Sequence, residues 1–288
     1  MLRACLPALL CAFVSGNTLA GDSATLRARH AALQEKLAHN PFGRSLHVES
    51  SAAGGAQKGE IFAVIDKPFS AVGAALERPA DWCHILELQM NIKRCDTAAE
   101  TVSAYITRKP RDPLESAHQV EFRFERAEAR ADYLRVGLNA ASGPMGTRDF
   151  EIKLEAAALD SARTFLNMSY AYALGGFARF AMDAYLAGAG RDKFGFTVVD
   201  RTADGRPVYV DGVRGVVERS AMRYYLGIEA HLESLAAAPD KRLETRLRRW
   251  YAATTRYPQL REVVSADEYL QMKLSELRAP VGLVDARR

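Results

Sequence analysis

Cysteine is scarce in this sequence, with four residues in 288, and two of them, Cys5 and Cys11, lie within the first 20 positions. Tryptophan is scarcer, with two residues. No apolar run after position 20 approaches the roughly 20 residues that a membrane-spanning helix needs. A large excess of charge of either sign is also lacking, because 39 lysines and arginines nearly balance 35 aspartates and glutamates, for a net charge of +4. So small a charge argues against nucleic acid as a partner.

The familiar catalytic and cofactor-binding signatures are missing as well. The sequence contains no HExxH, GxSxG, SxxK, Walker or GxGxxG motif, and no two of its six histidines are four residues apart. We therefore expect no metal and no cofactor, and we favour a binding protein over an enzyme. His231 falls on the apolar side of a predicted helix, which predicts a core histidine unless an acid lies beside it.

The first 20 residues, MLRACLPALLCAFVSGNTLA, have the pattern of a secretory signal peptide. Arg3 precedes an apolar run from about Leu6 to Val14, and Thr18 and Ala20 provide the small side chains that favour cleavage after Ala20. The sequence therefore predicts a secreted protein, with the periplasm as the favoured compartment. Lipid attachment at Cys11 is the alternative, although this cysteine lies inside the apolar run.

Cleavage after Ala20 would leave 268 of the 288 residues and two cysteines, Cys83 and Cys95. In an oxidising compartment, two remaining cysteines at this short spacing favour one disulfide, and two buried free thiols are the alternative. A chain of this length can bury a sizeable core in one large domain.

The residue pattern predicts strands and helices in a simple order. Several segments of the middle third alternate apolar and polar residues, and turn residues separate them. Consecutive strands without intervening helices form an antiparallel sheet. The expected elements are a helix at 23–39, strands at 45–50 and 59–66, a helix pair within 67–86, five to seven strands up to 174, a helix at 176–188, a hairpin around RTADGR, a long helix from 212 to about 238, and helices at 241–253 and 265–278.

This order resembles the START-like, or polyketide-cyclase-like, helix-grip superfamily. The segments that match are GEIFAVIDKPFSAVGAALERPADWCHIL and the long helix after the last hairpin. The resemblance covers roughly residues 45–238, and the whole chain also resembles secreted bacterial proteins. It implies an α+β fold in which an antiparallel sheet grips a long carboxy-terminal helix, with a cavity for lipids or other apolar molecules between them. The predicted organisation is a signal peptide at 1–20, an amino-terminal helix at 21–44, a helix-grip domain at 45–238 and a helical appendage at 239–288.

The long predicted helix, GVRGVVERSAMRYYLGIEAHLESL (212–235), has apolar residues on both sides, yet it also carries Arg214, Glu218, Arg219 and Arg223. A helix that is covered on both sides needs partners for its charges. Arg214 and Glu218 are four residues apart and can pair. Arg219 and Arg223 have the same spacing and repel unless an acid or an anionic ligand group lies between them. Three acids are candidates for this role: Asp183, Asp211 and Glu151.

Tyrosines form a second candidate feature. Tyr170 and Tyr172 alternate on a predicted strand and therefore share one face. Phenol groups in an apolar lining suit a ligand with an apolar body and a polar end, although core tyrosines with satisfied hydroxyls are the alternative. The predicted ligand-binding residues are Tyr170, Tyr172, Arg214, Glu218, Arg219, Arg223, Tyr224, Tyr225 and Ile228.

The sequence thus predicts noncatalytic binding or carriage of an apolar, lipid-like small molecule. Two alternatives stay open: an enzyme of cyclase or hydrolase type on the same scaffold, and an envelope protein that contacts other proteins through its final helices. The basic stretch KRLETRLRRW (241–250) is expected to be a solvated face that offers a peripheral contact to an anionic membrane.

Overall fold

A computed structural model describes residues 23–53, 55–188, 190–261 and 264–278. The predicted signal peptide, with Cys5 and Cys11, lies outside these residues. Eight strands form one antiparallel sheet in the order β1-β2-β8-β7-β6-β5-β4-β3. Their bounds are β1 (Leu46–Ala53), β2 (Ala56–Ile65), β3 (Ile92–Ala98), β4 (Thr101–Ile106), β5 (His118–Ala129), β6 (Tyr133–Ser142), β7 (Thr147–Ala158) and β8 (Thr164–Leu174).

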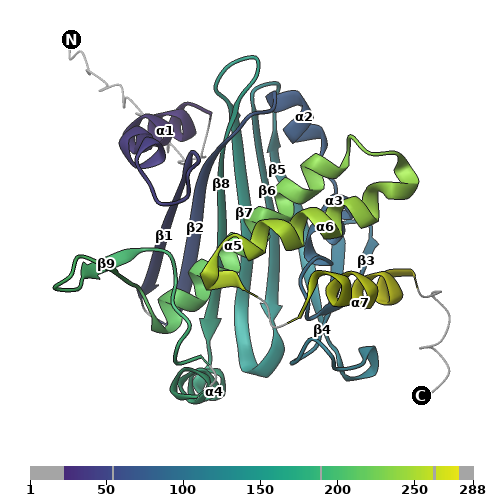
Figure 1. Cartoon of the computed structure of the whole chain (residues 1–288). Helices are drawn as coiled ribbons and strands as arrows, with labels where there is room; N and C mark the ends of the chain where they lie inside the picture. The colour runs from purple at the N-terminus through teal and green to yellow at the C-terminus, as the bar shows by residue number, and fades with distance from the viewer. Residues whose placement is uncertain (1–22, 54, 189, 262–263, 279–288) are drawn as a thin grey trace, which may run out of the picture.

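Helices cover both faces of the sheet (Figure 1). A small hairpin of β9 (Val198–Arg201) and β10 (Pro207–Tyr209) stands apart from the sheet and precedes the longest helix. The helices are α1 (Ser23–Ala38), α2 (Phe69–Ala74), α3 (Pro79–Leu86), α4 (Gly176–Ala187), α5 (Gly212–Ser234), α6 (Arg242–Thr255) and α7 (Ala266–Arg278). The predicted α+β class and the antiparallel sheet around a long helix are confirmed.

The 23-residue helix α5 lies across one face of the sheet and is buried on more than one side. Ala221, Met222 and Leu226 belong to the main hydrophobic core together with residues of most strands. Helix α6 packs across α5, and its Trp250 is fully buried in the same core. Helix α7 contributes Tyr269 to that core as well. The segment predicted as an appendage therefore shares the main core.

Helix α1 covers the opposite face of the sheet. Alternation along a strand sends successive side chains to opposite faces, so Ile61 of β2 enters the main core while its neighbour Phe62 points to the back. There Phe62 and Phe165 of β8 form a second core with Leu33 and other leucines of α1. Helix α1 thereby covers apolar surface that would otherwise face solvent.

Gly59 of β2 marks the place where α5 lies closest to the sheet. A Cβ atom at this position would lie 2.6 Å from the carbonyl oxygen of Val217 and 2.9 Å from its carbonyl carbon. Side-chain carbons do not approach backbone atoms so closely, so a side chain at residue 59 must push the helix away. The close approach holds α5 directly against β2, one strand in from the β1 edge of the sheet.

We expect Gly59→Ala to destabilise the protein by about 1–3 kcal/mol, because overpacking forces the backbone to shift. Urea denaturation measures the effect. Gly137→Ala in β6 is the matched control, since its Cβ would meet nothing closer than Asn139 Nδ2 at 3.4 Å. That control should be neutral or stabilise by up to about 0.5 kcal/mol. Equal effects of the two substitutions would contradict the close contact between α5 and β2.

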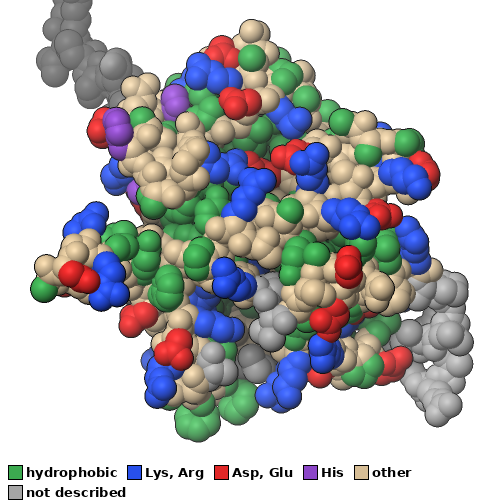
Figure 2. All heavy atoms as spheres, viewed as in Figure 1, with side chains coloured by type: hydrophobic (Ala, Val, Ile, Leu, Met, Phe, Trp, Pro, Cys, Tyr) green, Lys and Arg blue, Asp and Glu red, His purple; other side chains and the backbone are tan. Residues whose placement is uncertain are grey.

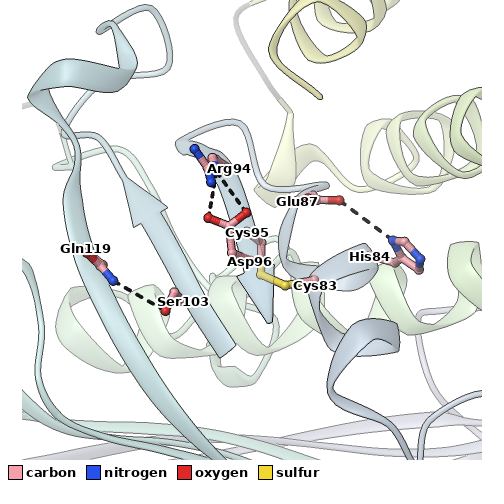
Figure 3. The surroundings of a disulfide bond; sticks show 8 residues. All are labelled: Cys83, His84, Glu87, Arg94, Cys95, Asp96, Ser103 and Gln119. Carbon is pink, nitrogen blue, oxygen red and sulfur yellow. Dashed lines mark hydrogen bonds and ion pairs between the residues drawn. A yellow bond between two sulfur atoms is a disulfide. The ribbon is translucent and has the colours of Figure 1, made fainter. Parts of the chain in front are cut away.

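The predicted disulfide between Cys83 and Cys95 is present and joins α3 to β3 (Figure 3). Cys83 lies in the main core, whereas Cys95 is half-buried beside it. On the strand side, Arg94 donates a hydrogen bond from Nε to Asp96 over 2.9 Å. The disulfide therefore fastens β3, the edge strand of the sheet, to the helix pair that precedes it.

Replacing both cysteines with alanine should lower the free energy of unfolding by about 3 kcal/mol, because the bridge restricts a short loop of the unfolded chain. The midpoint of urea denaturation reports this loss. Reduced wild-type protein should show the same midpoint as the double variant. Two free thiols in the unreduced, denatured protein would contradict the bridge.

The basic stretch at 241–250 differs in part from the prediction of a solvated face. Lys241, Arg248 and Arg249 are exposed, but Arg246 is buried where α6 packs against α5. Arg248 pairs with Glu244 along the helix. Among the described residues, no helix is long and apolar enough to span a membrane.

Candidate functional site

Three of the predicted tyrosines come together between the sheet and α5. Tyr170 and Tyr172 project from β8 toward α5, and the ring of Tyr224 lies 5.2 Å from that of Tyr170, centre to centre. The rings of Tyr170 and Tyr172 are 5.7 Å apart. The prediction that Tyr170 and Tyr172 share one face holds because residues two apart in a strand point to the same side. We call Tyr170, Tyr172 and Tyr224 the tyrosine cluster.

A β-bulge adds a fourth ring to this cluster. The pairing of β7 with β8 shifts register between Arg148 and Glu151, and Asp149 inside the shift has a positive φ of 53°. Bulges re-aim side chains locally. Phe150 consequently stacks on Tyr172, with ring centres 5.5 Å apart. The sequence analysis omitted Phe150, although it alternates with Ile152 along the strand, which could have assigned it to the inner face.

The hydroxyl groups of the tyrosine cluster make no hydrogen bond within the described part of the chain. Burial nonetheless raises the pKa of Tyr172 and of Tyr224 to about 12, and that of Tyr170 well above its usual value. The cluster therefore combines a desolvated aromatic setting with three hydroxyl groups that make no hydrogen bond among the described residues. A buried phenol normally finds a partner.

Arg219 lies beside the cluster and is only 3% exposed. It donates from Nη1 to the carbonyl oxygen of Phe194 over 3.1 Å, and the hydroxyl of Tyr185 on α4 is also close. Burial lowers the pKa of Arg219, and so does the charge of Arg223, whereas Tyr185 and Tyr172 raise it. Among the described residues, no carboxylate is within ion-pair distance of Arg219. None of the acids proposed from the sequence pairs with it there.

Glu218 has a different role from the one predicted. It is fully buried and accepts hydrogen bonds from the backbone N–H groups of Phe196 (2.6 Å) and Thr197 (2.9 Å) and from the hydroxyls of Thr197 and Ser50. Arg214 donates to the same Ser50 hydroxyl over 3.1 Å, so a hydroxyl bridges the predicted Arg214–Glu218 pair. Glu218 thus fastens the segment before β9 to α5 and β1.

The remaining predicted residues lie elsewhere on α5. Ile228 is fully buried in the main core. Tyr225 accepts a hydrogen bond from Arg44 over 2.9 Å and donates one to Glu229 over 2.7 Å, on the flank of α5 that faces the start of β1. Arg223 is half-buried, one turn from Arg219, and its charge acts on both Arg219 and Tyr224.

A groove of about 1050 Å³ runs along this second flank. Phe42, Phe196 and Tyr257 meet there with ring centres 5.7–6.0 Å apart. Arg44 and Glu229, which pair with each other, also line it. None of the nine predicted ligand-binding residues does. Figure 2 shows this face of the molecule, with hydrophobic side chains in the hollow between α1 and the helices α5 and α6.

An acid, Asp81, lies beside His231, as a catalytic role for this histidine would require. Its Nε2 lies 3.1 Å from the carbonyl oxygen of Ala75 and 3.5 Å from Asp81, and its Nδ1 lies 3.5 Å from Arg246. Because a carbonyl only accepts, Nε2 carries the proton and donates. All three residues are at most 4% exposed, so the group lies inside the junction of α3, α5 and α6.

A metal site has no candidate in the described ranges, where no group of three or more His, Cys, Asp or Glu side chains is placed to hold an ion. The exposed large apolar side chains described are Phe177 and Phe180 on α4 and valines of the β9–β10 hairpin. None of these lies on the final helices.

No family model matches the sequence, and the comparison with curated proteins found no match. Solved structures do match. The ZhuI aromatase/cyclase from Streptomyces sp. R1128 shares 13% identity over 72% of this chain and 98% of its own, with a TM-score of 0.34. A point mutant of norcoclaurine synthase from Thalictrum flavum, in complex with a transition-state analogue, shares 8% identity over 48% of this chain and 86% of its own, also with a TM-score of 0.34.

A conserved protein from Geobacillus kaustophilus shares 14% identity over 46% of this chain and 85% of its own, with a TM-score of 0.32. The aromatase/cyclase and the synthase are helix-grip proteins, the group that the sequence was predicted to resemble. At these identities and TM-scores, no ligand, activity or residue role carries over to this chain. The assignment of a site therefore depends on the geometry of the chain itself.

Proposed function

We propose that this protein binds, without catalysis, a lipid-like small molecule beside the tyrosine cluster, between β8 and α5. The observation that carries the proposal is the set of three phenol hydroxyls that make no hydrogen bond with the described residues, in a desolvated aromatic setting. Val217 and Leu174 belong to an apolar cluster that also contains Tyr172, next to the main core. An apolar lining with a few convergent polar groups is typical of small-molecule sites.

The groove on the other flank is the competing location. Its volume suits a ligand, but several of its charged groups already have partners: Arg44 pairs with Glu229, Arg163 with Asp160, and Glu233 with Arg249. Satisfied groups gain less from a ligand than unsatisfied ones. This difference favours the tyrosine cluster.

The cellular compartment is also part of the proposal. A disulfide between the two cysteines beyond the predicted signal peptide supports an oxidising compartment such as the periplasm. A peripheral contact with an anionic membrane through residues 241–250 would have few unpaired charges to use, because Arg246 is buried, and Lys241, Arg248 and Arg249 each pair with an acid. Exposed pairs like these weaken attraction to anionic lipid.

An uncharged apolar fluorophore tests the proposal. It should bind the mature protein with one molecule per chain, and extracted membrane lipid should displace it. Tyr172→Trp enlarges a side chain of the cluster and should weaken binding about 5- to 150-fold, since overpacking costs about 1–3 kcal/mol. Tyr257→Trp makes the same change in the groove and should leave binding unchanged. No binding, or loss only in the Tyr257 variant, would contradict the proposed location.

A further inference from the structure

Arg219 is a buried cation without a counter-charge in the described part of the chain. Its guanidinium donates a hydrogen bond to the carbonyl oxygen of Phe194, and the hydroxyl of Tyr185 lies close to it. A guanidinium stays protonated in proteins and has five N–H donors. An unpaired buried charge is strongly destabilising. A bound anion would remove that penalty.

The neighbours of Arg219 are suited to an anion as well. The hydroxyl of Tyr172 lies near enough for the two groups to interact electrostatically, and it makes no hydrogen bond with any described residue. The ring of Tyr170 packs beside that of Tyr172, and the ring of Tyr224 packs beside that of Tyr170; the hydroxyls of both also make no hydrogen bond with the described residues. Arg223 adds a second positive charge, one turn along α5. An anion at this place would meet the guanidinium of Arg219 and the hydroxyl of Tyr172.

The number of donors favours one class of anion. A carboxylate has two oxygens, whereas a phosphate monoester has three non-bridging oxygens and nearly two negative charges at neutral pH. Guanidinium groups match phosphate geometry particularly well. The guanidinium and the three hydroxyls together offer more donors than a carboxylate can use.

We propose that Arg219, with the hydroxyls of the tyrosine cluster, binds a phosphate group at the polar end of the ligand. This inference rests on the proposed function, because it assigns the polar end of the ligand whose apolar body that function places here. A phosphate-bearing lipid and free phosphate present the same chemistry, so both are possible sources.

Calorimetric titration with decyl phosphate, decanol and inorganic phosphate at pH 8 tests the inference. Wild-type protein should bind decyl phosphate at least about tenfold more tightly than decanol, a difference of about 1.4 kcal/mol. Arg219→Gln should abolish this preference and leave decanol affinity unchanged. Arg248→Gln, which removes one exposed positive charge, should keep it. If Arg219→Gln fails to fold, Tyr172→Phe removes only one oxygen and should reduce affinity for decyl phosphate about threefold.

The outcomes separate the two proposals. Equal affinities of wild-type protein for decanol and decyl phosphate would overturn the phosphate assignment and leave the lipid site intact. Absence of binding by all three compounds would overturn both. Tight binding of inorganic phosphate alone, lost in Arg219→Gln, would support the phosphate site and identify free phosphate as its source. An unchanged phosphate preference in a folded Arg219→Gln variant would overturn the role of Arg219.

Discussion

Glu218→Ala should lower the free energy of unfolding by about 3–5 kcal/mol, because it removes a fully buried carboxylate and leaves the hydrogen-bond donors around it without their acceptor. The N–H groups of Phe196 and Thr197 would lose their acceptor. The segment before β9 would then detach from α5 and β1. Urea denaturation followed by circular dichroism measures the loss.

Glu218→Gln is the matched control for this substitution. The amide keeps one acceptor oxygen for the two backbone N–H groups, and the hydroxyls of Ser50 and Thr197 can turn to accept from its NH₂ group. We expect a loss of about 1 kcal/mol, the difference between a charged and a neutral hydrogen-bonding partner. Equal losses for alanine and glutamine, or a loss below about 1 kcal/mol for alanine, would contradict the role of Glu218 as a fastening point.

The second large effect concerns Asp81, at the junction of α3, α5 and α6. Burial by itself raises the pKa of Asp81, but hydrogen bonds from His231 and Arg78 outweigh burial and hold the pKa below its usual value. Asp81→Asn removes the charge that faces His231 and the buried Arg246. We expect a loss of about 2–3 kcal/mol at neutral pH, since the substitution leaves a buried cation less well paired.

The effect of Asp81→Asn should depend on pH with a defined sign. A carboxyl whose pKa is lowered by folding stabilises the folded state above its ordinary pKa of about 3.9, and this contribution disappears as the pH falls through the lowered value. Wild-type and variant midpoints should therefore differ most above about pH 4 and converge below it. Asp240→Asn, at an exposed position, should change stability by less than about 0.5 kcal/mol. A difference between Asp81→Asn and wild type that grows on acidification would contradict this pairing.

The order of helices and strands was predictable because the signals are local. Apolar periodicity and turn residues predict the long helix at 212–235 and the hairpin before it from neighbouring residues alone. The shared face of Tyr170 and Tyr172 follows from strand geometry. The pairing of Cys83 with Cys95 followed from their being the two cysteines beyond the predicted signal peptide.

The partners of the charged residues were not predictable because they come from distant segments. Glu218 binds backbone N–H groups at 196 and 197, and an N–H group has no signature in the sequence. Arg246 belongs to a stretch whose charge predicts exposure, and only the packing of α6 across α5 buries it. The groove combines Phe42, Phe196 and Tyr257, and the fold alone brings them together.

The location of the ligand is tested most directly by nuclear magnetic resonance of the mature protein with ¹³C-labelled tyrosine rings. Single Tyr→Phe variants assign the signals, and decyl phosphate serves as the ligand. We predict that the signals of Tyr170, Tyr172 and Tyr224 shift together and saturate at one molecule per chain, while those of Tyr209 and Tyr257 in the groove stay in place. Shifts confined to Tyr209 and Tyr257, or no shifts at all, would contradict a binding site between β8 and α5.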